Sequence, residues 1–317
     1  MISDAPTSVS QPLADLRRQV STIIKGKQAQ TEDCLACLLA GGHLLIEDLP
    51  GVGKTTLAHV LSISLGLRFS RVQFTTDLMP ADLLGVSIYT PGAQAAGGAP
   101  FQFHPGPVFS QVLLADEINR AGPKTQSALL EAMEEYQVSV DGTTHALPLP
   151  FFVIATQNPS EQLGTHPLPE SQLDRFLMCI SLGYPDRQAE RELLMGQDSR
   201  EQLRALKPVM TPDQLRALQR QVLEVHVSPA LLDYLQALLE ATRSGEWFQE
   251  GLSPRAGLAL LRAARAKALL SGRDYVSPDD VQAILPQTIA HRLRPRGGSA
   301  RGAREQVRAM MAAVPLP

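Results

Sequence analysis

The sequence predicts an α/β domain built on a parallel sheet, followed by a second domain that is entirely helical. In the first half of the 317 residues, short apolar runs alternate with segments of helical periodicity, as in parallel strands connected by helices. Beyond about Pro185 the strand-like runs stop and only helical patterns remain. We therefore expect a sheet-containing core over residues 1–184 and a helical domain over residues 185–317.

Five apolar runs mark the expected strands of the core, and helical patterns separate them. A first helix has apolar residues at Leu57, Val60 and Leu61, the spacing of one helix face. Gly66 is a suitable end for this helix, and a second helix follows Pro123. The expected strands are His43–Glu47, Arg71–Thr75, Val112–Ala115, Phe151–Thr156 and Phe176–Leu182.

The helices of the second half begin with a repeated signal, a Ser or Thr N-cap followed by Pro. After Thr211, Gln214 completes a capping box. The end of this half is rich in arginine, which indicates either a solvated charged surface or a contact with another subunit or a polyanion. The N-cap pairs are Thr211–Pro212, Ser228–Pro229, Ser253–Pro254 and Ser277–Pro278, and the arginines are Arg292, Arg294, Arg296, Arg301, Arg304 and Arg308.

Composition restricts the class of protein without indicating an activity. Hydrophobic residues make up 44% and charged residues 19% of the chain, as in a globular protein rather than a disordered or disulfide-stapled one. The net charge of −3 argues against a polycation that binds nucleic acid. No apolar run reaches the roughly 20 residues of a membrane-spanning helix, and the first residues lack a signal-peptide pattern. We therefore expect a cytoplasmic protein.

Cysteine and histidine spacing gives little sign of redox or zinc chemistry. Cys34 and Cys37 have the C-x-x-C spacing of a redox pair. They also lie in an apolar helical pattern, where cysteine behaves as a small hydrophobic residue, and we favour this interpretation. The seven histidines show no zinc-binding spacing.

A glycine-rich loop between the first expected strand and the first expected helix indicates a nucleotide site. Glycines let backbone N–H groups wrap around phosphate, and the following helix N-terminus adds its dipole. Lys54 would reach the β- and γ-phosphates of ATP, and Thr55 would bind Mg²⁺. The strict motif has Gly where this chain has Asp48, which we expect to restrict the loop without removing the cradle. The nucleotide-binding residues are Pro50, Gly51, Val52, Gly53, Lys54, Thr55 and Thr56.

Two further strands end in polar side chains that would complete an ATPase site. Val112–Ala115 is followed by Asp116 and Glu117, and acids at this end of a parallel strand face the ligand edge of the sheet. Asp116 would hold Mg²⁺ through water, and Glu117 would polarise the attacking water. Phe151–Thr156 leads to Asn158, which would help to orient that water. Taken alone, the acids could be a helix cap and Asn-Pro a turn.

Two segments of the first half are predicted insertions. Ile88–Phe103 contains several Gly and Pro residues between β-prone stretches. Val138–Leu147 contains Asp141-Gly142 between alternating residues, a strong hairpin signal. Taken alone, both segments could be surface loops that precede the third and fourth strands.

Together these motifs resemble the AAA+ ATPases of the MoxR family. The resemblance extends from about Ile23 to about Pro295 and is more specific than a phosphate loop alone. It implies a P-loop AAA+ core, an αβα sandwich with a parallel sheet, followed by an all-α lid. The stretches that carry it are Pro50–Thr55, Phe74–Leu78, Pro105–Phe109, Leu114–Arg120, Lys124–Glu135, Ala155–Pro159, Leu173–Phe176 and Ser253–Ala256.

The resemblance implies a role for individual residues. Asn158 matches sensor 1, and Arg255 matches sensor 2. Arg175 matches the arginine finger that acts on the nucleotide of a neighbouring subunit, although a salt bridge with Asp174 or Glu170 is an alternative. The two insertions match the helix-2 insert and the pre-sensor-1 hairpin. The expected catalytic residues are Lys54, Glu117, Asn158, Arg175 and Arg255, and the residues expected to line the adenine are Ile23, Ile24 and Gly26.

An arginine finger from a neighbour implies a ring, which we expect to be a hexamer that uses ATP and Mg²⁺. The family resemblance implies chaperone-like remodelling, maturation or metal-cofactor insertion of client proteins, with a von Willebrand factor A-domain partner. A DNA translocase remains an alternative, because helicase relatives share the insertions, but the acidic balance argues against it. A nucleotide-gated scaffold is a further alternative, against which the intact Glu117 and Asn158 argue.

Overall fold

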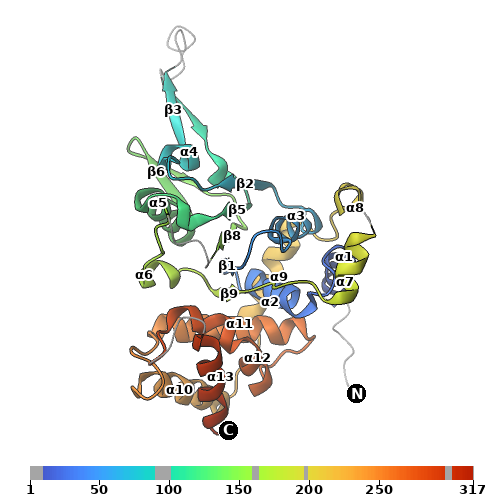
Figure 1. The fold of residues 1–317 in the computed structure, drawn as a ribbon, viewed down its shortest axis with the longest axis vertical. Coiled ribbons are helices and arrows are strands. Elements are labelled where there is room, and N and C mark those ends of the chain that lie inside the picture. The colour runs from blue at the N-terminus through green and yellow to red at the C-terminus, as the bar shows by residue number, and fades with distance from the viewer. Residues whose placement is uncertain (1–9, 90–100, 159–163, 196–198, 297–301, 317) are drawn as a thin grey trace.

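A central sheet lies between helices, with a β-hairpin projecting at one end and a helical layer at the other (Figure 1). The computed structural model describes residues 10–89, 101–158, 164–195, 199–296 and 302–316. The sheet is parallel and has five strands, and its order places β1 between β8 and β9. In sheet order the strands are β2 (Phe69–Gln73), β5 (Val112–Asp116), β8 (Phe152–Gln157), β1 (Leu44–Glu47) and β9 (Met178–Ile180).

Alternating strand residues feed two apolar clusters, one on each face of the sheet. On β1, Leu44 and Ile46 belong to the cluster under α2 (Gln28–Leu39) and α3 (Lys54–Ser64). Leu45 belongs to the opposite cluster, which includes the buried face of α5 (Pro123–Glu135). The predicted αβα core is therefore confirmed.

All five predicted strands are present. The fifth, predicted as Phe176–Leu182, covers only Met178–Ile180, and the second begins and ends two residues earlier than Arg71–Thr75. The register explains the shift, because Phe69 pairs with Val112 and Gln73 pairs with Asp116, the last residue of β5. Phe74 is fully buried, yet it lies beyond the strand. Because Phe74 is apolar, the sequence pattern placed the end of this strand beyond its observed end at Gln73.

The two predicted insertions contain antiparallel hairpins. The first hairpin is formed by β3 (Gly85–Tyr89) and β4 (Phe101–Pro105), and residues 90–100 between these strands in the sequence lie outside the described residues. The second is formed by β6 (Gln137–Val140) and β7 (Thr143–Ala146). Its Asp141-Gly142 turn has both residues at positive φ, as the hairpin signal predicted. The Phe103 and His145 rings stack with centroids 4.0 Å apart, which joins the hairpins.

The helices of the helical layer begin with the predicted N-caps. The Ser253 hydroxyl accepts a hydrogen bond of 3.2 Å from the Ala256 N–H, and Thr211 forms a reciprocal capping box with Gln214. Ser228 and Ser277 cap their helices in the same way. The helices of this half are α9 (Pro212–Glu224), α10 (Pro229–Arg243), α11 (Pro254–Leu270), α12 (Pro278–Ile289) and α13 (Ala303–Ala313).

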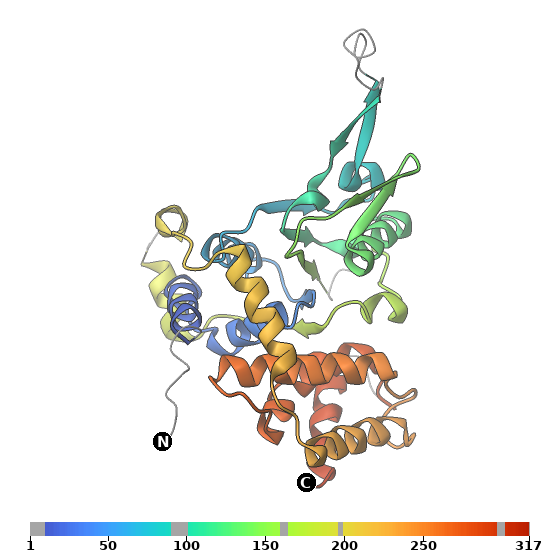
Figure 2. The same ribbon diagram turned by 180° about the vertical axis from the view of Figure 1, so that it is seen from behind.

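The chain does not pass directly from the sheet to the helical layer. Helices α7 (Arg187–Leu194) and α8 (Ser199–Ala205) lie beside α1 (Ser10–Ile23) on the flank of the core (Figure 1). Helix α9 then runs from this flank down to the helical layer (Figure 2). In that layer, α11 packs against α2 and α12 packs against β9, so one apolar cluster continues from the core into the layer. The boundary at 184/185 stays a prediction.

The described helices include none long and apolar enough to cross a membrane. Cys34 and Cys37 are free and buried on α2, and burial raises the pKa of both thiols. Both pack as small hydrophobic residues, the interpretation that the sequence favoured. Within the described ranges, no three His, Cys, Asp or Glu side chains gather as at a zinc site.

Candidate functional site

One cavity of about 390 Å³ lies where the parallel strands end, and we call it the loop cavity. The glycine-rich loop after β1 forms one wall, and the ends of β2, β5 and β8 supply the polar side chains opposite it. This is the edge at which α/β proteins bind their ligands. Its lining residues are Pro50, Gly51, Gly53, Lys54, Thr55, Thr56, Arg71, Gln73, Asp116, Glu117 and Asn158.

The loop has the backbone that a phosphate cradle requires. Gly51 and Gly53 have φ angles of 83° and 94°, in the region that side chains disfavour. A Cβ at either position would meet no protein atom within 4 Å, so conformation rather than crowding requires glycine. Lys54 begins α3, and its Nζ donates a 2.9 Å hydrogen bond to the Asp48 carbonyl. The lysine is thereby held over its own loop, at a helix N-terminus that favours anions.

Asp48, the departure from the strict loop motif, has a structural role. Its buried carboxylate accepts hydrogen bonds from the Leu49 N–H at 2.9 Å and from the Gly183 N–H at 2.6 Å. The Ser181 hydroxyl donates a third, at 3.1 Å. Glycine could make none of these contacts. The aspartate therefore ties the start of the loop to the segment that follows β9.

Asp116 lies at the end of β5 and is held from two sides. Arg71 of β2 donates to one carboxylate oxygen from Nη2 at 2.7 Å and from Nε at 3.2 Å. The Thr156 hydroxyl donates to the other oxygen at 2.6 Å. These contacts orient the carboxylate at the floor of the loop cavity.

Glu117 follows with φ 56° and ψ 51°, a left-handed conformation that costs a non-glycine residue on the order of 1–2 kcal/mol. Its N–H donates to the Thr156 hydroxyl at 2.9 Å, which helps to hold this conformation. One Glu117 oxygen accepts from Gln73 at 2.9 Å and from Arg120 at 2.8 Å. The contact with Gln73 holds the carboxylate toward β2, at the loop cavity.

The oxygen groups on this edge fit Mg²⁺. Thr55 and Asp116 line the same cavity, and hydroxyl, carboxylate and water oxygens are the ligands that Mg²⁺ prefers. The carboxylate of Asp116 is paired with the Arg71 guanidinium. A cation at Asp116 would therefore share the carboxylate with Arg71 or displace it.

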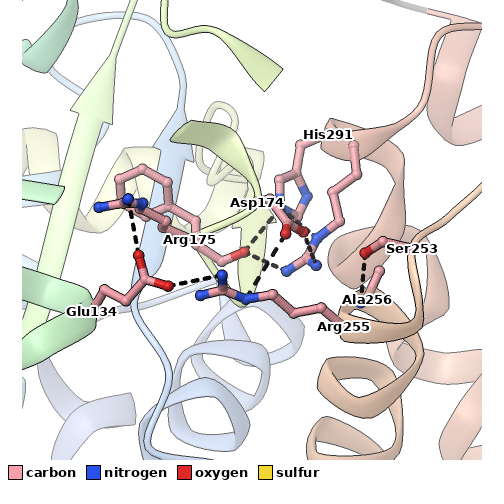
Figure 3. A network of polar contacts seen from close by, with 9 residues as sticks. Glu134, Asp174, Arg175, Ser253, Arg255, Ala256 and His291 are labelled. Atoms are coloured by element: carbon pink, nitrogen blue, oxygen red, sulfur yellow. Dashed lines mark hydrogen bonds and ion pairs between the residues drawn. The ribbon is translucent and has the colours of Figure 1, made fainter. Parts of the chain in front are cut away.

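Arg175 and Arg255 lie together at a second cavity of about 290 Å³, which we call the arginine cavity. It shares no lining residue with the loop cavity. Figure 3 shows the two guanidinium groups reaching the same carboxylate, that of Glu134. The lining residues are Ala40, Gly41, Gly42, His43, Met133, Glu134, Tyr136, Asp174, Arg175, Leu177, Arg255, Leu258, Ala259, Arg262 and Arg292.

The arginine cavity is held by a network of ion pairs. Glu134 Oε2 lies 2.9 Å from Arg175 Nη2, and Oε1 lies 2.9 Å from Arg255 Nη1. Asp174 pairs with Arg292 at 2.5 Å and lies 3.9 Å from Arg255 Nε. The salt bridge of Arg175 is therefore with Glu134, and not with Asp174 or Glu170, the partners considered from sequence.

Of the C-terminal arginines that the structure describes, Arg292 and Arg304 are partly buried, whereas Arg294, Arg296 and Arg308 are exposed. Arg292 pairs with Asp174, and Arg294 pairs with Glu170 of α6 (Glu170–Leu173). Arg304 donates to the Cys179 carbonyl at 3.0 Å. Arg301 lies outside the described residues. This segment thus fastens the helical layer to α6 and β9.

His43 is buried in the wall of the arginine cavity and is held neutral. Its Nδ1 accepts a hydrogen bond of 3.0 Å from the Val153 N–H, so Nε2 is the atom that donates to the Met133 carbonyl at 3.1 Å. Burial lowers the pKa of His43 to about 4. This histidine joins β1, β8 and α5, the elements behind the cavity.

Four of the predicted nucleotide-binding residues do not line the loop cavity. Val52, Ile23 and Ile24 pack against the apolar cluster. Gly26 has φ +67°, and its position adjoins Asp186. The structure thus brings together the phosphate-handling residues, while the predicted adenine segment lies apart from their cavity.

Three residues at these cavities were missed from sequence. Arg71 and Gln73 stand two apart on β2, so they share a face beside β5, a signal that a strand pattern could have given. No sequence pattern indicated a role for Glu134, because it is one of several acidic residues on an amphipathic helix. Its contact with Arg255 spans 121 residues of sequence.

Comparison with known proteins agrees with this architecture. Residues 43–178 match the ATPase family associated with various cellular activities, AAA, and residues 240–312 match the AAA lid domain. The chain is similar to a crystal structure from Cytophaga hutchinsonii described as a candidate ATPase. That likeness has a TM-score of 0.83 and 35% identity, and it covers 94% of each chain.

Curated relatives resemble the chain over most of its length. The uncharacterized protein YeaC of Bacillus subtilis is 47% identical over 86% of this chain and 84% of its own. Chaperone MoxR1 of Mycobacterium tuberculosis is 43% identical over 87% of this chain and 74% of its own. The similarity spans both the core and the helical layer.

Proposed function

Because this chain belongs to the MoxR family of AAA+ ATPases and is an ATP hydrolase, we propose that it hydrolyses ATP as a ring. In that ring each subunit binds ATP in its loop cavity and offers its arginine cavity to the nucleotide of a neighbour. We further propose that the ring is a hexamer and remodels client proteins.

The observation that carries the ring is the separation of the two cavities. The loop cavity contains the lysine, hydroxyl and acidic groups of an ATPase, but Arg175 and Arg255 line a different cavity. Because the two cavities share no lining residue, we propose that a subunit does not bring both arginines to its own γ-phosphate. A second copy of the chain supplies the phosphate that they would contact.

The chemistry assigned to the chain follows from the loop cavity. Lys54 and the loop N–H groups would bind the phosphates, and Thr55 and Asp116 would hold Mg²⁺. When bound, Mg²⁺ neutralises charge on the β- and γ-phosphates. Glu117 accepts a proton from the attacking water, and Asn158 holds that water in line. The arginines of the neighbour stabilise the charge that spreads over the transferring phosphoryl group.

Client remodelling rests on the hairpins and on a relative. The first hairpin projects from the core (Figure 1). Tyr89, which ends β3, and Phe101, which begins β4, are both exposed. A relative that is 43% identical is named a chaperone. We propose that the hairpins contact a client polypeptide and that a von Willebrand factor A-domain protein delivers it.

Subunit mixing tests this arrangement. Arg175→Ala subunits keep a complete loop cavity, and Lys54→Ala subunits keep a complete arginine cavity, so each should be inactive alone. Mixed rings should recover ATPase activity, because an arginine finger contributes about 10³–10⁵ in rate. Well-formed mixed rings without recovery would contradict an arginine that acts between subunits. Strong stimulation of turnover by DNA would favour the translocase instead.

A further inference from the structure

We propose that Glu134 is a positioning residue that holds Arg175 and Arg255 as one unit for the nucleotide of the neighbouring subunit. This inference rests on the proposed ring. Glu134 contacts the guanidinium groups of Arg175 and Arg255, and in the proposed role it acts through these two arginines (Figure 3).

The geometry of the carboxylate supports this role. Each Glu134 oxygen pairs with a different guanidinium, and both distances are 2.9 Å. Among the residues that the structure describes, Glu134 is the only acid paired with Arg175. Its side chain is 32% exposed, so the pairing is partly shielded from water and salt.

Charge balance explains why the two arginines need a bridge. Arg175, Arg255, Arg262 and Arg292 bring four positive charges to the cavity, and Glu134 and Asp174 bring two negative charges. Asp174 makes its close pair with Arg292. Without Glu134, the guanidinium groups of Arg175 and Arg255 would repel each other and separate.

The bridge leaves both arginines able to bind phosphate. A guanidinium has five N–H donors in one plane, and Glu134 takes a donor from only one nitrogen of each. The side chains of Arg175 and Arg255 are 29% and 56% exposed. Fixing one edge of a guanidinium sets the direction of its free edge, which is the preorganisation that charge stabilisation requires.

Glu134 also joins the two halves of the protein. Glu134 lies near the end of α5, and Arg175 follows α6, so both belong to the core. Arg255 lies in the first turn of α11, where the Ser253 cap fixes the backbone. One carboxylate therefore sets the distance between a core arginine and a helical-layer arginine.

In the test, Glu134→Gln is introduced into only one of the two kinds of subunit in a mixed ring at a time. In the parent mixture, Lys54→Ala subunits donate arginines and Arg175→Ala subunits hydrolyse ATP. Glu134→Gln on the donor should lower kcat about tenfold, equal to about 1.4 kcal/mol, and leave KM for ATP unchanged. The same substitution on the hydrolysing subunit should have no effect, because its arginine cavity is already inactive.

Glu131→Gln is the matched control, since it removes the same charge one turn earlier on α5. Among the described residues Glu131 makes no ion pair or side-chain hydrogen bond, so this variant should leave the mixture unchanged. Glu134→Ala on the donor should lower kcat at least as much as Glu134→Gln. Ring assembly and thermal midpoint are measured for every variant.

The outcomes separate the inference from the proposed function. Equal losses with Glu134→Gln on either subunit would mean a general structural role and overturn the inference, as would no loss on the donor. If the parent mixture itself fails to recover activity, the ring mechanism is wrong, and the inference is overturned with it. If the parent mixture recovers ATPase activity but Glu134→Gln on the donor does not lower it, the inference about Glu134 is wrong and the proposed ring mechanism stands.

Discussion

The loop cavity and the arginine cavity are built in different ways. The loop cavity takes six of its lining residues from the continuous stretch Pro50–Thr56, and the rest come from the ends of neighbouring strands. The arginine cavity lies where the segments that directly follow α2 and α6 meet α5, α11 and the short helix Ala290–Arg292. A contact such as Glu134 to Arg255 exists only because helices distant in sequence pack together.

This difference predicts how each cavity responds to amino-acid substitution. The loop cavity depends on backbone conformation and on single chemical groups, so one substitution should remove one function cleanly. The arginine cavity depends on a shared network, so its residues should act together and their substitutions should not be additive. The experiments below test that contrast.

Among substitutions at the loop cavity, the largest expected effect is on hydrolysis. Glu117→Gln should lower turnover by about 10²–10⁴-fold, because it removes the general base. ATP affinity should remain close to that of the wild type, since Lys54 and the loop are intact. Single-turnover hydrolysis and nucleotide binding measure the two properties, and undiminished turnover would remove Glu117 from this role.

A second substitution should weaken ATP binding itself. Lys54→Ala deletes the charge over the loop, and a hydrogen bond to a charged group is worth about 1.5–3 kcal/mol, or roughly 10- to 150-fold in affinity. Titration calorimetry with ATP and Mg²⁺ measures the loss. Near-normal ATP affinity would contradict the assignment of the loop.

Acid should weaken the wall of the arginine cavity. The pKa of His43 lies near 4 in the folded protein and near 6.5 when unfolded, so the unfolded state binds the extra proton between these values. Stability should therefore fall as pH drops from 6.5 toward 4, by about 2 kcal/mol down to pH 5. His291, whose pKa burial lowers to about 3, acts in the same direction.

His43→Asn is the informative variant, and denaturant unfolding at several pH values is the measurement. It should be less stable at pH 7 and show a shallower loss on acidification. Asp33, whose pKa burial raises to about 6, opposes the trend, because its folded form gains a proton first as pH falls. An unchanged slope in His43→Asn would show that His43 does not govern acid stability.

The smallest expected effect separates the two cavities directly. Arg255→Ala should lower ring turnover about tenfold, equal to about 1.4 kcal/mol, and should leave ATP affinity of the same subunit within about threefold. The reason is that Arg255 lies outside the loop cavity. A large loss of ATP affinity in isolated Arg255→Ala subunits would place Arg255 on its own nucleotide and remove the contrast.

The sequence predicted best where local rules determine the structure. Helix caps at Thr211 and Ser253 and the Asp141-Gly142 turn were readable because each depends on only a few adjacent residues. The end of β2 was misplaced because Phe74 is buried for reasons of packing and not of strand pairing. Arg71 was missed because its partner, Asp116, lies on a strand 45 residues away.

By itself, the sequence determined the succession of strands and helices along the chain, the glycine-rich loop and the acidic end of the third strand, because short-range patterns encode these features. Only the tertiary structure decided where Arg175 and Arg255 lie. Their position depends on how α11 packs beside α5 and α6, and on the Glu134 carboxylate between them. Packing of distant helices joins groups that no local spacing relates, and that is why the arginine cavity could not be predicted from the sequence alone.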